Sequence, residues 1–425
     1  MTPRRLVVVP YFFPPFPGSG NRWLSMARHL QRRGHSVTVV ATAAFGRLAD
    51  DGERGVVRVG DLRSLRVVRR VLRRGELSTG GTALAVPPSA LLTRVVVPDV
   101  QVLAWLPAAL LVVRRLLSRE AVDCLITSGP PDSNHLIGLL LGSRRPPWIA
   151  DFRDGWCFEP LRQPFPTPAQ RFLDAWLEHR VAREADIAVG ATRPIAEDLE
   201  RRLDAHAAYV PSGWDPEEAP QTLTSSERAR ADDTRRDGDK PVSLVYTGTF
   251  SGVRGSNPGP LLRALHLVRA IPGVPPVRLT LAGRLTNDER ILIERSGVMD
   301  VVDHVGLLTR GAALALQRSA DALVLLTSRS RSEATGKLFE YLGAGRPIIA
   351  LAEGNEAERI VRETNTGVTV PPDDVDAIVR ALRRVASGEL EKEYAPRNLE
   401  GYTYPGPAEA MAELIETAIR LRAQS

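Results

Sequence analysis

Residues 6–41 have the sequence LVVVPYFFPPFPGSGNRWLSMARHLQRRGHSVTVVA, and this stretch indicates the fold class. The apolar run 6–9 predicts a buried strand, residues 11–20 a loop rich in proline and glycine, and residues 21–33 an amphipathic helix. A second strand is expected over residues 36–41. This order is the typical opening of a doubly wound parallel sheet, in which ligands bind at the carboxyl ends of the strands.

The same alternation continues along the chain. Further strands are expected at 124–127 and 148–150, and a polar, charged segment from 212 to 240 is typical of a domain connection. A second series of strands and helices begins after it. The predicted fold is α/β, with two Rossmann-like parallel-sheet domains: residues 1–210, a linker over 211–240, a second domain over 241–404, and a helix over 405–425 that packs back on the first domain.

Composition limits the class of protein. The chain is 43% hydrophobic and 25% charged, which excludes wholesale disorder and a polytopic membrane protein. Its net charge is +6, and because lysine occurs only three times, arginine supplies 53 of the 56 basic residues. Because this preference for arginine is uniform along the chain, it favours a codon or lineage preference over a nucleic-acid-binding surface, whose basic residues would cluster on one face. Two cysteines and the absence of a secretory segment predict a cytoplasmic protein.

Residues 95–117 are strongly apolar, but Pro98 and Pro107 interrupt them and two arginines lie near their end. The segment therefore fails as a transmembrane helix. Two interpretations stay open. It forms helices that face an acceptor or a membrane, next to the basic stretch 63–74, or it is a core segment with a solvated basic neighbour.

A candidate anion site lies between two predicted strands. A short helix is predicted over residues 336–344, and its N-terminus directs the backbone N–H groups of Thr335, Gly336 and Lys337 at a ligand. Lys337 adds a full positive charge. Glu340 follows one turn later, where a pair of ribose hydroxyls is its natural partner. A nucleoside-diphosphate site and an ordinary turn with a surface Lys/Glu pair explain this pattern equally well.

Taken in order, several motifs resemble the family 4 retaining glycosyltransferases of GT-B fold, in which two Rossmann-like domains face a cleft. The resemblance covers nearly the whole chain, in residues 10–22, 128–138, 151–156, 210–215, 246–249, 281–283 and 337–341. It implies an enzyme that holds a nucleoside-diphosphate sugar mainly on its second domain and receives the acceptor on its first.

The resemblance also implies roles for individual residues. Lys337 and Arg254 would neutralise the phosphates as catalytic residues. From their own positions in the chain, Asp154 is expected to be catalytic and, with Arg153, to line the acceptor or sugar subsite, and Arg22 and His135 are expected to contact the acceptor. Capping of its own helix is the alternative for His135. The implied donor-binding residues are Gly18, Ser19, Gly20, Thr249, Gly283, Val305, Leu307, Glu333, Thr335, Gly336 and Glu340.

The chain departs from the family pattern at three places. Ser332 stands where the first of two spaced glutamates is common, with Glu333 one position later, so either Glu333 takes that role or sugar recognition differs. Thr249 replaces one of two cations, and Arg153 with Asp154 replaces a histidine.

No metal and no cofactor are expected, because a helix dipole and cations can stabilise the leaving group in place of a metal. The one Asp-x-Asp match, which begins at Asp374, is interpreted as a helix N-cap. The expected partners are a UDP- or GDP-type nucleotide sugar and an acceptor, without nucleic acid. Peripheral membrane contact and the choice between monomer and homodimer are left open.

The leading hypothesis is a metal-independent retaining glycosyltransferase that acts on a small-molecule acceptor, a specialised metabolite. One alternative is a lipid-linked or polysaccharide acceptor at a membrane surface. A nucleotide-sugar epimerase on the same fold is another. A catalytically inactive nucleotide-binding partner subunit is the last, motivated by Ser332 and Thr249.

Overall fold

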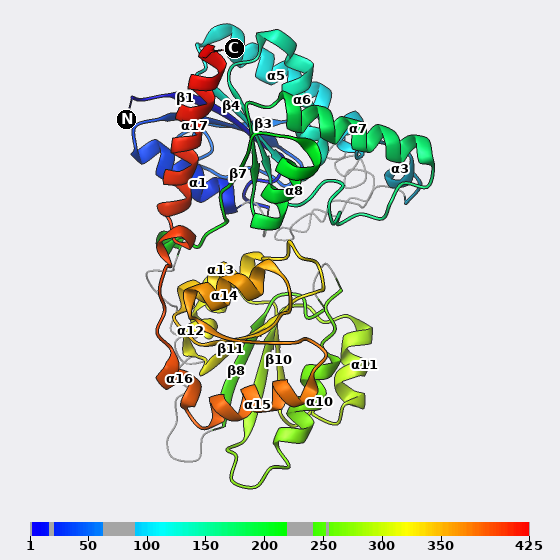
Figure 1. Cartoon of the computed structure of the whole chain (residues 1–425), viewed down its shortest axis with the longest axis vertical. Coiled ribbons are helices and arrows are strands. Elements are labelled where there is room, and N and C mark those ends of the chain that lie inside the picture. The colour runs from blue at the N-terminus through cyan, green and yellow to red at the C-terminus, as the bar shows by residue number, and fades with distance from the viewer. Residues whose placement is uncertain (1, 17–20, 63–89, 219–240, 252–254, 425) are drawn as a thin grey trace. The chain divides into compact units, whose positions relative to one another are not determined.

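The computed structural model describes residues 2–16, 21–62, 90–218, 241–251 and 255–424, which form two α/β units (Figure 1). The first unit comprises Met1–Ser212 together with Tyr404–Ser425, and the second comprises Gly213–Thr403. The chain thus leaves the first unit after Ser212 and returns to it at Tyr404. Most of the expected linker, residues 219–240, lies outside the described residues.

The first unit contains a parallel sheet of seven strands in the order β3-β2-β1-β4-β5-β6-β7. The direction of winding changes between β1 and β4, and ligands bind at such a switch point in open α/β sheets. The strands are β1 (Arg5–Pro10), β2 (Ser36–Thr42), β3 (Val56–Val59), β4 (Cys124–Gly129), β5 (Trp148–Phe152), β6 (Ile187–Gly190) and β7 (Ala207–Tyr209).

Helices cover both faces of this sheet. They are α1 (Asn21–Arg32), α3 (Ala90–Val95), α4 (Gln101–Ala104), α5 (Leu106–Arg119), α6 (Leu136–Leu141), α7 (Pro168–Glu184), α8 (Arg193–Leu203) and α17 (Gly406–Gln424). The C-terminal α17 lies beside α1 (Figure 1) and buries Met411 and Ile415 in one cluster with Leu6 and Val8 of β1. The end of the chain therefore completes the core that its beginning starts.

The apolar segment at 95–117 forms α4 and α5. Leu106, Ala109 and Val113 of α5 point into the core, and Trp105 is fully buried against Tyr11 with ring centroids 5.2 Å apart. Among the described residues, no helix is both long and apolar enough to cross a membrane. The basic stretch 63–74 lies outside the described residues.

The second unit repeats the architecture with six parallel strands in the order β10-β9-β8-β11-β12-β13, and its switch point lies between β8 and β11. The strands are β8 (Val242–Thr247), β9 (Val277–Ala282), β10 (Val302–Gly306), β11 (Ala322–Leu326), β12 (Ile348–Leu351) and β13 (Gly367–Val370). The helices are α10 (Gly259–Val268), α11 (Asn287–Arg295), α12 (Arg310–Ser319), α13 (Gly336–Ala344), α14 (Glu356–Thr364), α15 (Val375–Ala386) and α16 (Glu389–Glu393).

The expected fold class, two parallel-sheet α/β domains, is confirmed. The helix predicted over residues 336–344 coincides with α13, and Gly345 ends it with a φ of 68°. Asp374 is a helix N-cap, as expected, because its carboxylate accepts a hydrogen bond of 2.9 Å from the backbone N–H of Ala377.

Candidate active site

The switch point of the second sheet brings Lys337 of α13 to the end of β8. Its Nζ lies 4.3 Å from the centroid of the Tyr246 ring, donates to the Tyr246 hydroxyl, and lies 3.3 Å from the carbonyl oxygen of Thr249. The Tyr246 hydroxyl donates in turn to the same carbonyl at 2.6 Å. The ammonium is thereby held against the loop that follows β8.

This position affects both the charge of Lys337 and the backbone beneath it. Burial lowers the pKa of the ammonium to about 8, and the nearby carboxylates of Glu333 and Glu340 only partly oppose the shift. A Cβ at Gly248 would lie 3.0 Å from the Lys337 Cε, and Gly248 has a φ of 96°. A glycine is therefore needed where the lysine crosses the loop.

The N-terminus of α13 lies at the same place and carries no side-chain cap. Thr335 occupies the N-cap position with extended backbone, yet its hydroxyl is buried and makes no hydrogen bond to any described residue. By contrast, side chains cap four other helices of the second unit, α11, α12, α14 and α15. The first N–H groups of α13 are thus available to an anion, next to the charge of Lys337.

Glu340, one turn along α13, is held by two residues of α12. Its Oε1 accepts from Arg310 at 2.7 Å, and its Oε2 lies 3.4 Å from the amide nitrogen of Gln317. Arg310 also donates to Glu218 at 2.6 Å. Burial would lower the pKa of Arg310, but the two carboxylates outweigh it and raise the pKa. Gln317 also donates to Thr247 at 3.0 Å, which ties α12 to the end of β8.

Glu333 lies in the loop between β11 and α13 and is 7% exposed. Its Oε2 accepts from the backbone N–H of Ser328 at 2.7 Å and from the Ser328 hydroxyl. The adjacent Ser332 is 4% exposed. The carboxylate therefore stabilises the loop at the end of β11, beside the switch point, while Ser332 packs inside it.

The ends of β9 and β10 form the other border of this site. A Cβ at Gly283 would lie 2.1 Å from the carbonyl oxygen of Gly248, so only glycine fits where the ends of β8 and β9 meet. His304 Nε2 donates to the Gly283 carbonyl at 2.8 Å. Val305 and Leu307 follow with 45% and 65% of their surface exposed. Two exposed apolar side chains thus stand where the strands end.

In the first unit, Asp151 at the end of β5 is the centre of a buried network. Its carboxylate accepts from Arg22 at 3.0 Å, from Trp23 Nε1 at 2.9 Å and from the Ser128 hydroxyl at 2.8 Å. Arg22 also donates to the carbonyl of Pro211 at 2.6 Å. Burial would raise the pKa of Asp151, but the charge of Arg22 and the hydrogen bonds lower it. The network joins β4, β5, α1 and the segment after β7.

The residues expected to contact the acceptor lie around this network. Arg22 and His135 are buried, with 6% and 0% exposure, whereas Arg153 and Asp154 are half-buried on the loop after β5. Arg153 donates to the carbonyls of Gly129 at 2.9 Å and Pro130 at 3.0 Å, which holds the loop after β4. The structure therefore leaves Arg153 and Asp154 nearer the surface than the other two.

His135 is enclosed by aromatic residues. It stacks on Phe152 with ring centroids 4.5 Å apart and lies 2.9 Å from the hydroxyl of Thr127, which accepts from Trp148 Nε1 at 2.8 Å. Burial lowers the pKa of its imidazole to about 3, so the ring is neutral near pH 7. No hydrogen bond from its side chain caps α6, the helix that follows. These contacts support a packing role.

Four residues of the expected site, Gly18, Ser19, Gly20 and Arg254, lie outside the described residues. Most of the others lie near the carboxyl ends of strands in the unit to which each belongs, whereas Arg22 lies on α1. In the second unit, Glu333, Thr335, Gly336, Lys337 and Glu340 lie just before or in the first turns of α13, and the others lie at the ends of β8, β9 and β10. In the first unit, Arg153 and Asp154 follow β5.

Both halves of the chain match known families. Residues 17–213 match the glycosyl transferase 4-like domain, and residues 241–387 match glycosyl transferases group 1. The chain belongs to the group 1 glycosyltransferases. Among curated proteins, none matches this chain.

Solved structures similar to this group 1 glycosyltransferase span nearly all of both chains. Sucrose-phosphate synthase from Thermosynechococcus elongatus is 16% identical with a TM-score of 0.59, covering 99% of this chain and 98% of its own. A glycosyltransferase from Rickettsia africae ESF-5 is 11% identical with a TM-score of 0.56, covering 100% and 98%. UDP-GlcNAc 2-epimerase from Neisseria meningitidis, bound to UDP-GlcNAc, is 13% identical with a TM-score of 0.53, covering 98% and 100%. Such identities show the shared GT-B fold alone.

Sequence reasoning missed three polar residues of this group 1 glycosyltransferase: Arg310, Gln317 and Asp151. Arg310 and Gln317 reach Glu340 from a different helix, and Asp151 reaches Arg22 across 129 positions of the chain. No local pattern marks such pairs. The one available signal was the position of Asp151 at the end of a predicted strand, where functional loops begin.

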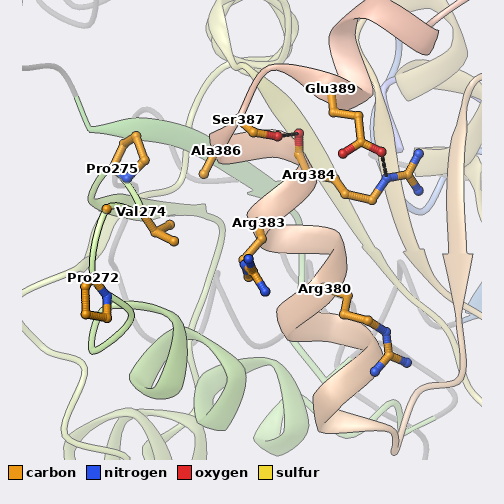
Figure 2. A pocket seen from close by; sticks show the side chains of 10 residues that line it. Pro272, Val274, Pro275, Arg380, Arg383, Arg384, Ala386, Ser387 and Glu389 are labelled. Carbon is orange, nitrogen blue, oxygen red and sulfur yellow. Dashed lines mark hydrogen bonds and ion pairs between the residues drawn. The ribbon is translucent and has the colours of Figure 1, made fainter.

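A separate hollow of about 530 Å3 lies in the second unit of this glycosyltransferase, between the end of α15 and the loop that leads into β9 (Figure 2). Its residues are Pro272, Gly273, Val274, Pro275, Arg380, Arg383, Arg384, Ala386, Ser387 and Glu389. Arg384 donates to Glu389 across its rim at 2.8 Å. Because the hollow lies where β9 begins, it is at the opposite edge of the sheet from Lys337.

Proposed function

We propose that this group 1 glycosyltransferase is a metal-independent retaining enzyme that transfers a sugar from a UDP- or GDP-sugar to a small-molecule acceptor. The observation that carries the proposal is the uncapped N-terminus of α13 with Lys337 beside it at the switch point of the second sheet. A diphosphate is the ligand that this arrangement suits, because backbone N–H groups, the helix dipole and an ammonium all favour negative charge.

The proposed chemistry follows from where charge develops. The bond between the anomeric carbon and the β-phosphate oxygen breaks, and negative charge grows on that phosphate. Fixed positive groups at this oxygen lower the barrier, which is the role we assign to Lys337 and the α13 N-terminus. The acceptor attacks from the face that the phosphate leaves, and the departing phosphate oxygen takes the acceptor proton. The anomeric configuration is thereby retained.

The remaining donor contacts are assigned by position. Glu340 would accept hydrogen bonds from the ribose hydroxyls while Arg310 and Gln317 hold it in place. The exposed Val305 and Leu307 would flank the base. We propose that Glu333 faces the transferred sugar through the oxygen that Ser328 does not occupy.

We assign the acceptor or sugar subsite of the first unit to Arg153 and Asp154. Both are half-buried on the loop after β5. The buried Arg22 and His135 would position the surrounding loops. A cytoplasmic location is proposed, which the two free cysteines support.

The test is calorimetric titration with UDP and with GDP in the presence of a chelator. One nucleotide should bind without metal, and Glu340→Ala should weaken that binding. In a turnover assay Lys337→Ala should lose about 100- to 1,000-fold, comparable to the loss of one oxyanion donor. Lys392→Ala is the matched control, because Lys392 lies on α16 away from the switch point. Full turnover by Lys337→Ala would refute the assignment.

If neither nucleotide binds, the chain is better described as an inactive partner subunit. Product analysis separates the other classes, because an epimerase releases an altered nucleotide sugar in the absence of any acceptor. A lipid-linked or polysaccharide acceptor at a membrane surface is the second candidate. The specific observation that favours it is the outer face of α7.

A further inference from the structure

Helix α7 of the first unit has its acidic residues on the inside. Asp174 and Glu178 are 4% and 1% exposed. Asp174 accepts from Trp156 Nε1 at 2.9 Å, and Glu178 accepts from Arg202 at 2.8 and 2.9 Å and from the backbone N–H of Cys157 at 2.9 Å. The carboxylates therefore anchor the first half of the helix to the unit, while the buried Val181 and Ala182 anchor its second half in the usual apolar way.

The outer face of α7 carries the large apolar side chains instead. Phe172 is 72% exposed, Trp176 47% and Leu173 43%. Trp176 is four positions after Phe172 and three after Leu173, and side chains at these spacings are neighbours on a helix surface, so the three form one patch. None of the exposed residues of α7 is acidic: Pro168, Ala169, Arg171, Phe172, Leu173, Ala175, Trp176, His179, Arg180 and Arg183.

Helix α3 extends this patch. Gln170 of α7 donates to the backbone carbonyls of Arg94 and Val95 at 3.1 and 3.0 Å, which fixes the end of α3 beside the start of α7 (Figure 1). Val95 is 56% exposed, and Leu161 in the loop before α7 is 46% exposed. Isolated exposed apolar residues are common on soluble proteins, but a patch with two aromatic rings and an arginine border marks a binding surface.

We infer that the outer face of α7 docks on an anionic lipid bilayer. Tryptophan and phenylalanine prefer the boundary between acyl chains and headgroups, while arginines contact lipid phosphates. The Arg180 guanidinium lies 5.7 Å from the centroid of the Trp176 ring, so ring and charge stand together on this face. Arg180 also pairs with Glu184, and Arg183 with Asp204 at 2.7 Å, so lipid phosphates would compete with these two carboxylates. A symmetric dimer through the same patch would bring arginines against arginines, which disfavours a second copy as the occupant.

This inference goes beyond the proposed function, because it concerns where the enzyme works and not what it transfers. A bilayer-bound first unit meets acceptors that partition into membranes. Donor binding belongs to the second unit, so nucleotide binding and bilayer binding are separate measurements, and one can fail without the other.

Bilayer binding can be followed by the intrinsic tryptophan fluorescence of the protein. Of its six tryptophans, all in the described part of the chain, four are buried, Trp214 is half-buried and only Trp176 is exposed. Brominated acyl chains quench fluorescence only from indoles that reach the bilayer. The full-length protein is mixed with brominated vesicles of phosphatidylcholine, alone or with phosphatidylglycerol. Vesicles that contain phosphatidylglycerol should quench the emission, and added salt should reverse the effect.

Three variants sharpen the test. Phe172→Ser with Trp176→Ser should lower the vesicle-bound fraction by about tenfold, since two aromatic side chains no longer leave water. The matched control is Ile291→Ser with Met299→Ser, which changes two exposed apolar residues of the second unit and should bind as the parent does. Trp176→Phe should still bind but lose the quenching. All three should match the parent in circular dichroism and in hydrogen-exchange protection of both units, which shows that the unit carrying each change still folds.

Two results would overturn the inference. The first is equal binding, or none, to neutral and anionic vesicles. The second is a dimer in light scattering that the α7 double variant converts to a monomer while vesicles are not bound, which would make the patch a contact between two copies of this chain.

Discussion

Lys337 combines a catalytic assignment with an unusual acidity, because burial against Tyr246 lowers the pKa of its ammonium to about 8. The charged form predominates at pH 7 and is lost as the pH rises through 8. The same pKa shift affects stability in the other direction: as the pH rises and the charged form is lost, the free energy of unfolding increases. A folded pKa below the unfolded value means that the contribution of Lys337 to stability improves between pH 8 and its ordinary value of 10.5.

We therefore predict that kcat/KM falls as the pH rises through about 8, while thermal stability does not fall with it. The measurement is a pH profile of the parent enzyme and of Lys337→Arg. Arginine keeps its charge throughout this range, so the variant should be less active but should lack the alkaline decline. An unchanged decline in Lys337→Arg would assign that pKa to another group.

For individual residues, the sequence was sufficient to predict which charged side chains lie at the site, but not which residues they contact. Lys337 and Glu340 stand on one short helix whose limits follow from Gly336 and Gly345, so local pattern was sufficient. Arg310 and Gln317 come from a different helix, and only the packing of α12 beside α13 brings them to Glu340. The burial that makes Thr335 and His135 unusual is likewise a tertiary property.

Among the elements, the junction around Asp151 joins the ends of β4 and β5, the start of α1 and the segment after β7. Its ion pair with Arg22 is buried on both sides, with 0% and 3% of the side chains exposed. A buried charge that loses its partner is expensive, because the remaining charge is neither hydrated nor compensated.

Asp151→Asn should therefore lower the free energy of unfolding by about 3 kcal/mol. Because the folded pKa of Asp151 lies below its unfolded value, this stabilisation is present above about pH 4 and is lost as the pH falls through the folded pKa. Chemical denaturation at pH 7 and at acidic pH measures both effects. The control is Asp50→Asn, which breaks an exposed pair with Arg54 and should cost less than about 1 kcal/mol. Equal losses of unfolding free energy in the two variants would show that the buried ion pair stabilises the protein no more than the exposed one.

Some helices and strands could be predicted from their sequences and others could not. The strand at 6–9 and the helix at 21–33 follow ordinary patterns, and β1 and α1 appear there. Helix α7 could not be recognised in this way, because Asp174 and Glu178 occupy its inner face and Phe172 and Trp176 its outer face. Periodicity reports which residues alternate and not which of them are buried.

At the scale of the whole molecule, the C-terminal helix α17 forms part of the core of the first unit. Met411 and Ile415 are buried in the cluster that contains Leu6, and Arg4 donates to Glu416 at 2.8 and 2.7 Å. Removing residues 406–425 deletes this burial. The two large side chains alone contribute on the order of 4 kcal/mol.

The truncated chain should lose protection from hydrogen exchange in β1, β2 and α1, while β8, β9 and α13 keep theirs. Exchange followed by mass spectrometry on the parent and truncated proteins measures this. The second unit serves as the internal control, since α17 belongs to the other unit. Uniform loss across both units would mean that the molecule unfolds as one cooperative body.

The chain crosses between its units only twice, after Ser212 and before Tyr404, so the whole second unit is an insert within the first. Each crossing is anchored in the first unit by the same residue: Arg22 donates to the Pro211 carbonyl, and its own carbonyl accepts from the Tyr404 hydroxyl at 3.0 Å. The second unit is therefore an insert whose two attachment points are fixed by one residue of the first unit. If the second unit holds the donor as proposed, exchanging it between relatives would change the sugar that is transferred and leave the core of the first unit intact.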